Sequence, residues 1–284
     1  KFNENNKTTT IKRYSNDFPL MINITPYKKE EESMILTNKI NNDSYYSFLL
    51  SYLVLNKKTN HILLPIVNLD IRFNQISDIL DKIDSFDYYM NEIQNGKISD
   101  LFSLRVREDF FKSISLENYL KENKVNLKPI LFQLIHTLAV IQDEYPNFRH
   151  NSLSPSNIMV YLRNDMNVDD SIEYSFNKNK YYLKNSKLDI KITNFNDSNL
   201  EKNNDKKIPF ANLNNKYFDL HYFLNTLLYK NKISNLDDET TDFLNRILPK
   251  KVRGKGKNNF YLEKSVELFK PSNLLEDKYF NEYK

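Results

Sequence analysis

The first half of the chain contains separate stretches of strand-like and helix-like hydrophobic patterning. Residues 18–25 are apolar and rich in β-branched side chains, which predicts a strand. From Asp43 to Leu55 apolar residues recur every three or four positions, which predicts a helix with Asn42 or Asp43 as its N-cap. The side chains expected to form one buried stripe on this helix are Tyr45, Phe48, Leu49, Tyr52 and Leu55.

A second strand is expected over residues 61–71. It should be interrupted at Pro65, because proline cannot donate a hydrogen bond within a central strand. The pattern is weaker between Phe73 and Asn126, where residues 115–123 combine a serine cap with a short helical pattern. We therefore expect a boundary near residue 100, which separates an N-terminal domain of residues 1–100 from a C-terminal domain of residues 101–284.

The strongest helical pattern follows Pro129 and ends before Pro146. Its wide apolar face consists of Ile130, Leu131, Leu134, Ile135, Leu138 and Ile141. Further along the chain, strands are expected at residues 158–162 and 188–193, an additional hairpin at 174–183, and helices at 218–229 and 237–248. The second half is therefore expected to be mainly helical.

Glycine is the most restrictive feature of the composition, since the chain contains only Gly96, Gly254 and Gly256. Loops that bring backbone amides close to phosphate groups need glycine, because a Cβ atom blocks the approach or the positive φ angle. Neither G-x-G-x-x-G nor G-x-x-x-x-G-K-[ST] occurs, which excludes dinucleotide-binding Rossmann enzymes and P-loop NTPases. The absence of cysteine excludes disulfide-linked partners, thiolate zinc sites and cysteine nucleophiles.

Charged residues are numerous but balanced, with 41 basic and 37 acidic side chains and a net charge of +4. Nucleic-acid binding would therefore have to act through a local patch. The strongest basic cluster consists of Lys250, Lys251, Arg253, Lys255 and Lys257. A solvated loop is the alternative interpretation. No stretch has the roughly 20 apolar residues of a membrane span, and residues 1–14 do not resemble a signal peptide, so we expect a soluble cytoplasmic protein that does not enter a membrane.

Residues 148–160, between the long helix and the next strand, resemble the catalytic loop of protein kinases. In that loop the sequence His-Arg-Asp-Leu-Lys-Pro-x-Asn-Ile-Leu follows a helix and precedes a strand. The matching positions are His150, Leu153, Pro155, Asn157 and Ile158. Residues 192–196, Ile-Thr-Asn-Phe-Asn, resemble the kinase Asp-Phe-Gly segment and retain its phenylalanine as Phe195.

A third match places Asp219 on a helix. Residues 217–224 resemble the kinase helix whose buried aspartate fixes the backbone of the catalytic loop. Together the matches imply an α+β class and a two-lobed protein-kinase-like fold, with a small β-rich N-lobe and a mainly helical C-lobe. The amino-acid sequences of these segments and the abundance of Asn and Lys resemble those of kinase-like proteins of large AT-rich DNA viruses, including giant viruses of amoebae. This similarity implies a location in the host cytoplasm or the virion.

The groups that phosphoryl transfer requires are missing from the matched positions. Ser152 stands where the family has its proton-accepting aspartate, and Asn194 where it has its metal-binding aspartate. Asn23 occupies the position of the strand lysine, and the partner glutamate would fall at Tyr45 or Tyr46. An amide is a much weaker ligand for Mg²⁺ than a carboxylate. The glycine-rich loop is also absent.

The residues that are retained serve backbone geometry and packing in the family: His150, Pro155, Phe195 and Asp219. Of the metal-binding set, Asn157 alone remains. The resemblance therefore implies a pseudokinase, that is, a catalytically inactive scaffold or binding protein. We expect a protein partner, no cofactor and no metal ion.

Two other functions stay open on the sequence alone. An atypical active serine/threonine kinase would use Asn157, with Asp197 as a displaced Mg²⁺ ligand and Lys28 or Lys29 as a migrated lysine. These three charged residues are more commonly solvated surface groups. A nucleic-acid-binding protein would use the basic cluster, with a strong dependence of its affinity on salt. His221 lies on a helix among aromatic residues, and we interpret it as a packed side chain rather than a ligand.

Overall fold

The chain forms two compact units. The computed structural model describes residues 2–3, 8–14, 19–30, 39–82, 85–110, 112–122, 125–163, 167, 170–184, 186–200, 217–230, 236–248, 250–254 and 268–284. The first unit combines residues 1–51 with 63–111, and the second combines residues 52–62 with 112–284. The boundary expected near residue 100 falls inside a strand of the first unit, which continues to Phe111.

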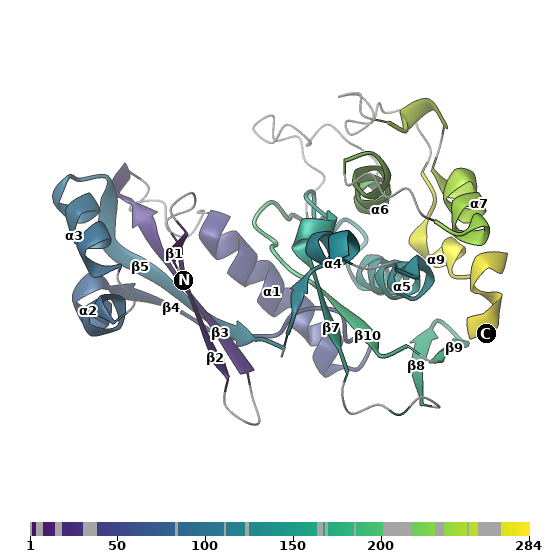
Figure 1. The fold of residues 1–284 in the computed structure, drawn as a ribbon, viewed down its shortest axis with the longest axis horizontal. Helices are drawn as coiled ribbons and strands as arrows, with labels where there is room; N and C mark the ends of the chain where they lie inside the picture. Colours follow the sequence, from purple (N-terminus) through teal and green to yellow (C-terminus); the bar gives the residue numbers. More distant parts are fainter. Residues whose placement is uncertain are drawn as a thin grey trace. The chain divides into compact units, whose positions relative to one another are not determined.

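The first unit is built on a five-stranded antiparallel sheet with the order β1-β2-β3-β5-β4 (Figure 1). Its strands are β1 (Phe2–Asn3), β2 (Thr8–Tyr14), β3 (Pro19–Lys28), β4 (Pro65–Arg72) and β5 (Ile98–Glu108). β3 confirms the strand predicted at residues 18–25. Pro65 is the first residue of β4, an edge strand, where a missing amide costs no central ladder hydrogen bond.

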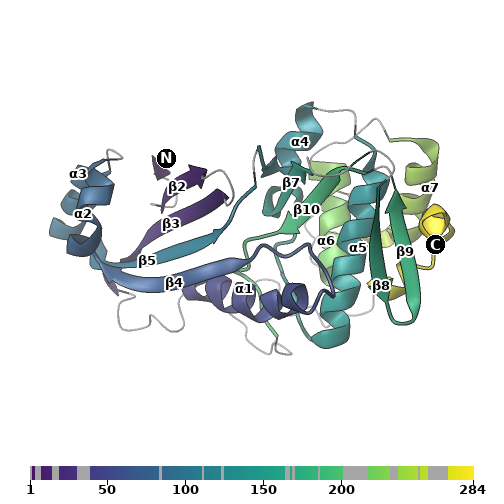
Figure 2. The same cartoon turned by 90° about the horizontal axis from the view of Figure 1, so that it is seen from below.

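One face of this sheet is apolar and carries two helices, α2 (Phe73–Asp81) and α3 (Phe86–Gln94) (Figure 2). Their shared core consists of Ile24, Phe73, Ile76, Leu80, Tyr89, Ile98 and Phe102. The two helices and β5 all lie between Phe73 and Asn126, where the hydrophobic pattern was too weak to predict them. β5 is nevertheless paired on both sides, with β3 and β4.

Helix α1 (Lys39–Leu55) confirms the predicted helix but begins before Asp43 and buries a different face. Tyr46, Leu50 and Leu53 are the buried side chains, at 7%, 0% and 0% exposure. The predicted stripe is wrong, because Tyr45, Phe48, Tyr52 and Leu55 are exposed by 58%, 44%, 52% and 72%, and Leu49 is only partly buried. Both faces of α1 are apolar, so periodicity alone could not select between them.

The second unit is mainly helical and surrounds α5 (Leu127–Glu144), in which every residue from Ile130 to Ile141 is buried. Its short strands are β6 (Ile114–Ser115), β7 (Ile158–Leu162) and β10 (Leu188–Ile192), in a sheet of order β10-β7-β6, and the separate hairpin β8 (Ser171–Phe176) and β9 (Asn179–Lys184). The remaining helical segments are α4 (Leu116–Glu122), η2 (Pro155–Asn157), α6 (Phe218–Asn225), the π-helical turn η3 (Thr226–Lys230), α7 (Asp238–Ile247), η4 (Lys250–Val252), α9 (Pro271–Leu274) and η5 (Lys278–Tyr283). The predicted long helix, both strands, the extra hairpin and the two later helices are confirmed.

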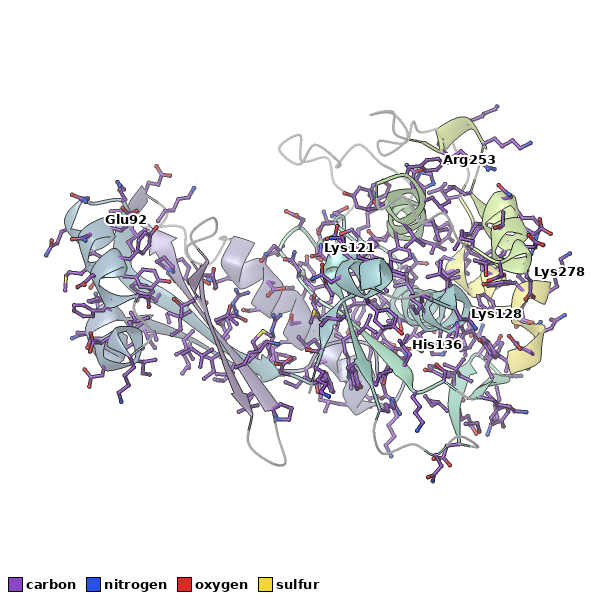
Figure 3. The ribbon with its side chains drawn as sticks, in the orientation of Figure 1. Glu92, Lys121, Lys128, His136, Arg253 and Lys278 are labelled. Atoms are coloured by element: carbon purple, nitrogen blue, oxygen red, sulfur yellow. The ribbon has the colours of Figure 1, made fainter. Side chains whose placement is uncertain are left out.

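Lys128, at the start of α5, connects this central helix to α7 and to the last residues of the chain (Figure 3). Its Nζ lies 3.0 Å from a carboxylate oxygen of Glu239 and 2.8 Å from one of Glu282. The amine also lies over the ring of Tyr279, 4.9 Å from the ring centre. One cation therefore ties three parts of the helical unit together.

The segment of residues 52–62 is anchored in the second unit by a buried charge cluster. His61 Nδ1 lies 2.9 Å from Asp189 Oδ1, and both side chains are fully buried. Arg163 donates two hydrogen bonds to Asp189 Oδ2, and the Tyr161 hydroxyl donates a third. His61 Nε2 lies 3.0 Å from the hydroxyl of Tyr174 on the β8–β9 hairpin.

This cluster lowers the pKa of Asp189. Burial opposes ionisation of the carboxyl group, but its hydrogen bonds and charge interactions with His61 and Arg163 outweigh burial. A second set of contacts joins the same segment to β10, since the Ile192 amide donates to the His61 carbonyl at 2.8 Å. The extra hairpin and residues 52–62 are thus held by one ionised carboxylate.

The predicted α+β class is confirmed, with a small unit that carries an antiparallel sheet and a larger, mainly helical unit. Within the described ranges, none of the helices has the length and apolar character needed to cross a bilayer.

Candidate functional site

The kinase-like loop and the helix that carries Asp219 meet through two backbone hydrogen bonds. The carboxylate of Asp219, on α6, accepts from the amide of His150 at 2.7 Å and from that of Asn151 at 2.9 Å. Asp219 is only 1% exposed. Asn151 has a φ angle of +62°, a left-handed conformation in which Asn is more common than most residues. The carboxylate therefore holds this turn of the loop in place.

Burial raises the pKa of Asp219, although the charges and hydrogen bonds of His150 and Asn151 favour the ionised form. The charge of the half-buried Arg149 also favours the ionised form of Asp219, and burial lowers the pKa of Arg149 itself. The carboxyl group of Asp219 thus serves the loop backbone, and its burial works against ionisation.

His150 and Phe195 connect the catalytic-like loop to the segment after β10. His150 Nε2 lies 3.0 Å from the carbonyl oxygen of Thr193, and its ring centre lies 5.1 Å from that of Phe195. Both side chains are 1% exposed. The two matched segments are therefore adjacent in space, as the resemblance implied, and the residues with architectural roles form their contact.

Three asparagines form a chain of side-chain hydrogen bonds, and two of them, Asn157 and Asn194, are matched to the family's metal-binding positions. The amide of Asn196 donates to Asn194 Oδ1 at 2.6 Å, and the amide of Asn194 donates to Asn157 Oδ1 at 3.0 Å. The amide of Asn157 in turn donates to the backbone carbonyl of Ser152 at 2.7 Å. We call Asn157, Asn194 and Asn196 the amide chain.

The amide chain is electrically neutral, and the side-chain oxygens of Asn157 and Asn194 each already accept a hydrogen bond. Mg²⁺ is held in proteins chiefly by carboxylates and phosphate oxygens. Among the residues that the structure describes, no group of three His, Asp or Glu side chains is arranged to hold a metal ion. Asn194 has a φ angle of +66°, which explains an asparagine at this turn independently of any ligand.

Ser152 lies beside His150 but makes a weak contact with it. Its Oγ is 3.4 Å from His150 Nδ1, near the limit of a hydrogen bond. A serine hydroxyl at this position carries no charge at neutral pH, so it cannot take the proton-accepting role of an aspartate. The loop thus places a neutral hydroxyl group beside the buried His150.

In the first unit, Asn23 is positioned on β3 and donates to Thr10 Oγ1 at 2.9 Å. Tyr45 is exposed and Tyr46 is buried on α1. An ion pair that the sequence analysis missed joins the sheet to α1: Arg105 on β5 lies 2.5 Å from Asp43. Arg105 is the direct cross-strand neighbour of Asn23. Asp43 had been considered only as a helix cap, and β5 had not been predicted.

Four other residues were considered as candidates: Lys28, Lys29, Asp197 and His221. Lys28 lies 3.9 Å from Glu30, with both side chains exposed. Lys29 is an exposed residue that directly follows β3. The carbonyl of Asp197 accepts a hydrogen bond from the side chain of Asn151, which ties the loops together. His221 is buried on α6, in agreement with a packed side chain.

Three residues of the basic cluster, Lys250, Lys251 and Arg253, lie within the described part of the chain. Lys250 and Lys251 are exposed on η4. The guanidinium of Arg253 donates to the side chain and the backbone carbonyl of Asn245 at 2.8 and 3.1 Å (Figure 3). Lys255 and Lys257 lie outside the described residues. Arg253 therefore has a local structural role.

No protein-family model matches the chain. It is 31% identical over 242 residues to "Uncharacterized protein R402" of Acanthamoeba polyphaga mimivirus, with 82% of this chain and 27% of that protein covered. "Putative serine/threonine-protein kinase R400" of the same virus is 27% identical over 239 residues, with 74% and 51% covered. "Putative serine/threonine-protein kinase R301", also from mimivirus, is 32% identical over 124 residues, with 38% and 31% covered. The chain spans about half of these relatives' length or less.

Among solved structures, WaaP in complex with acyl carrier protein aligns with 98% of this chain and 81% of its own, at 8% identity and a TM-score of 0.44. The family assignment therefore rests on the mimivirus proteins that are similar in sequence. The predicted resemblance is confirmed, since the chain is related to kinase-like proteins of a giant virus.

Proposed function

We propose that the kinase-like part of this protein does not transfer phosphate and acts as a binding or scaffolding unit. The observation that carries the proposal is the amide chain. Its three neutral side chains satisfy one another, and one of them, Asn194, stands where phosphoryl transfer requires a carboxylate that holds Mg²⁺. Converting this arrangement into a metal site would require breaking its hydrogen bonds without gaining a negative charge.

Selective retention of structural residues supports the same proposal. Asp219 and His150 keep their backbone contacts, which are needed for the fold of the loop. Ser152 and Asn194 replace the two acids that would act on substrate and metal. A binding unit needs Asp219 and His150 for the fold of the loop, but it does not need acids at the positions of Ser152 and Asn194.

A phosphate-transfer assay tests the proposal directly. The protein is incubated with ATP labelled on its terminal phosphate, with Mg²⁺ or Mn²⁺, and with general protein substrates. We expect no labelled protein above background, including the protein itself. Transfer that is lost in Asn157→Ala and kept in Asn91→Ala, a control on the exposed surface of α3, would overturn the proposal.

Thermal shift measurements provide a second test. A ligand at 100 times its dissociation constant stabilises the folded state by about 2.7 kcal/mol. We expect Mg²⁺ to add nothing to any effect that ATP has in EDTA. Stabilisation by ATP that depends on Mg²⁺ and disappears in Asn157→Ala would show that a metal site survives.

The second candidate function, an atypical active kinase, is favoured by the ion pair between Arg105 and Asp43. Both side chains are largely buried, at 20% and 10% exposure, and they connect a strand to α1 as a lysine and a glutamate do in active kinases. Arg105→Met separates the two candidates. In an active kinase the Arg105→Met substitution should abolish phosphate transfer. If the pair is purely structural, neither the wild type nor the variant transfers phosphate.

The binding role predicts a protein partner, in the host cytoplasm or the virion. Purification from the native source, followed by identification of stoichiometric companions, tests this part. A nucleic acid that co-purifies in stoichiometric amount, and is released by salt, would favour the basic cluster and contradict a protein partner.

A further inference from the structure

The polar face of the sheet in the first unit carries two arginines whose charges are unequally neutralised. Arg105 and Arg107 are two residues apart on β5, so both side chains lie on the same face, opposite the core under α2 and α3. In register, Asn23 faces Arg105 and Met21 faces Arg107 across the β3–β5 pair. Lys12 on β2 faces Met21 from the other side. We call these five residues the arginine face.

Two of its three cations have carboxylate partners. Arg105 is paired with Asp43, and Lys12 Nζ lies 3.0 Å from Asp109. The terminal nitrogen of Arg107 instead lies 3.0 Å from the sulfur of Met21, a weak acceptor. Within the described part of the chain, no carboxylate comes within ion-pair distance of Arg107. Counted over the described residues alone, three cations and two acids leave one positive charge in excess.

The hydrogen-bonding capacity of the arginines is also incomplete. The Nε atoms of Arg105 and Arg107 are both buried and have no acceptor among the described residues. Burial lowers the pKa of Arg107, and Asp43 and Asp109 attract it only from a distance. A buried, unpaired guanidinium donor is unfavourable, because desolvation is not repaid by a partner.

We propose that the arginine face binds the oxyanion of a phosphate group, with Arg107 as its principal contact. Successive same-face positions on a strand are about 7 Å apart, and a phosphate has acceptor oxygens pointing in several directions, so one group can accept from both arginines. Arginine is suited to this role because its guanidinium forms planar, paired hydrogen bonds to phosphate. The phosphate is free or belongs to a phosphomonoester. All contributing residues lie in the first unit, and the proposed contacts need no metal.

Calorimetric titration in EDTA tests the site with two probes, inorganic phosphate and O-phosphoserine, at ionic strength held constant with chloride. The variant is Arg107→Met, which removes the charge and keeps an unbranched apolar side chain beside Met21. Arg72→Met is the control, since Arg72 on β4 is 62% exposed and already paired with Asp100.

We expect both probes or one of them to bind the wild type and the Arg72→Met variant equally, and to bind Arg107→Met at least tenfold more weakly. Tighter binding of O-phosphoserine than of inorganic phosphate identifies a phosphomonoester as the ligand class, and the reverse identifies free phosphate. If neither probe binds better than chloride, or if Arg107→Met binds as well as the wild type, the proposal is overturned.

A thermal melt without phosphate separates ligand binding from a structural role. We expect Arg107→Met to melt at or above the wild-type temperature, because an unpaired charge has been removed. A large fall in melting temperature, or failure to fold, would mean that the guanidinium stabilises the sheet itself, and would contradict the site. Loss of phosphate binding leaves the proposed absence of catalysis untouched, since that rests on the second unit.

Discussion

Two buried aspartates of the second unit show how differently the same side chain is stabilised. Asp189 and Asp219 are 0% and 1% exposed. Asp189 receives a guanidinium, an imidazole and a hydroxyl group, whereas Asp219 receives two backbone amides. The pKa of Asp189 is lowered and that of Asp219 is raised, although burial opposes ionisation in both. The partners of Asp189 outweigh burial, whereas the two amides and the charge interactions with His150 and Arg149 do not outweigh it for Asp219.

The comparison indicates what buried charge is used for in this protein. Asp189 anchors residues 52–62 and the β8–β9 hairpin, and Asp219 fixes the catalytic-like loop. In both cases the carboxylate holds protein groups together. At the neighbouring positions where a kinase would aim charge at a ligand, the chain has the neutral Ser152 and Asn194. Both buried carboxyl groups support the fold, whereas the side chains at these two loop positions are neutral.

The largest expected effect is that of Asp189→Asn. Removal of the carboxylate charge leaves the guanidinium of Arg163 in a buried cluster without its counter-ion, which typically costs about 3–5 kcal/mol. Urea denaturation at pH 7 measures the loss. Tyr161→Phe removes one hydrogen bond from the same carboxylate and should cost about 1 kcal/mol. A loss below about 1 kcal/mol in Asp189→Asn would mean that the cluster is not ionised.

Asp219→Asn should have a smaller effect, of about 1–3 kcal/mol. An asparagine presents one acceptor oxygen, so one of the amides of His150 and Asn151 loses its partner. The reference is Asp242→Asn on the exposed surface of α7, for which we expect no measurable change. An Asp219→Asn variant as stable as the wild type would show that the loop conformation does not depend on these two bonds.

Asn194→Asp replaces an amide donor of the amide chain with a carboxylate and should cost about 1 kcal/mol at pH 7. The new oxygen would face Asn157 Oδ1, where the amide of Asn194 now donates. Part of the loss should be recovered at low pH, when the carboxyl group is protonated and can donate again. Chemical denaturation at pH 7 and pH 4 checks this expectation. Equal stability of variant and wild type at pH 7 would mean that the amide chain contributes little.

Local sequence patterns were sufficient to predict the elements that surround the site. The helix after Pro129, the strands at 158–162 and 188–193, and the positions of His150 and Asp219 all follow from short segments with distinctive spacing. A loop that must place a buried histidine, a proline turn and a helix-borne aspartate in fixed order leaves a specific sequence pattern. The role of Asp219 could therefore be predicted from the sequence pattern, without knowledge of its hydrogen bonds.

The parts that could not be predicted depend on contacts between distant segments. Helix α1 has apolar residues on two faces, and tertiary packing, which the local pattern does not contain, buries Tyr46 and leaves Tyr45 exposed. The pair of Arg105 with Asp43 joins residues 62 positions apart, and the role of Arg163 depends on Asp189 in another strand. Neither pair has a local signature, because charged residues are common throughout the chain.

The smallest expected effect is a difference in pH dependence between the two aspartates. The folded-state pKa of Asp189 is lowered, so its contribution to stability is present above the unfolded-state value, about 3.9, and is lost as the pH falls below it. The folded-state pKa of Asp219 is raised, so the folded protein takes up its proton first and gains stability as the pH falls toward that same value. From pH 7 to pH 3, the advantage of the wild type over Asp189→Asn should shrink, and its stability relative to Asp219→Asn should rise. Denaturation curves at each pH measure both differences, and a change of the same sign in both would contradict the contrast between an aspartate whose pKa is lowered and one whose pKa is raised.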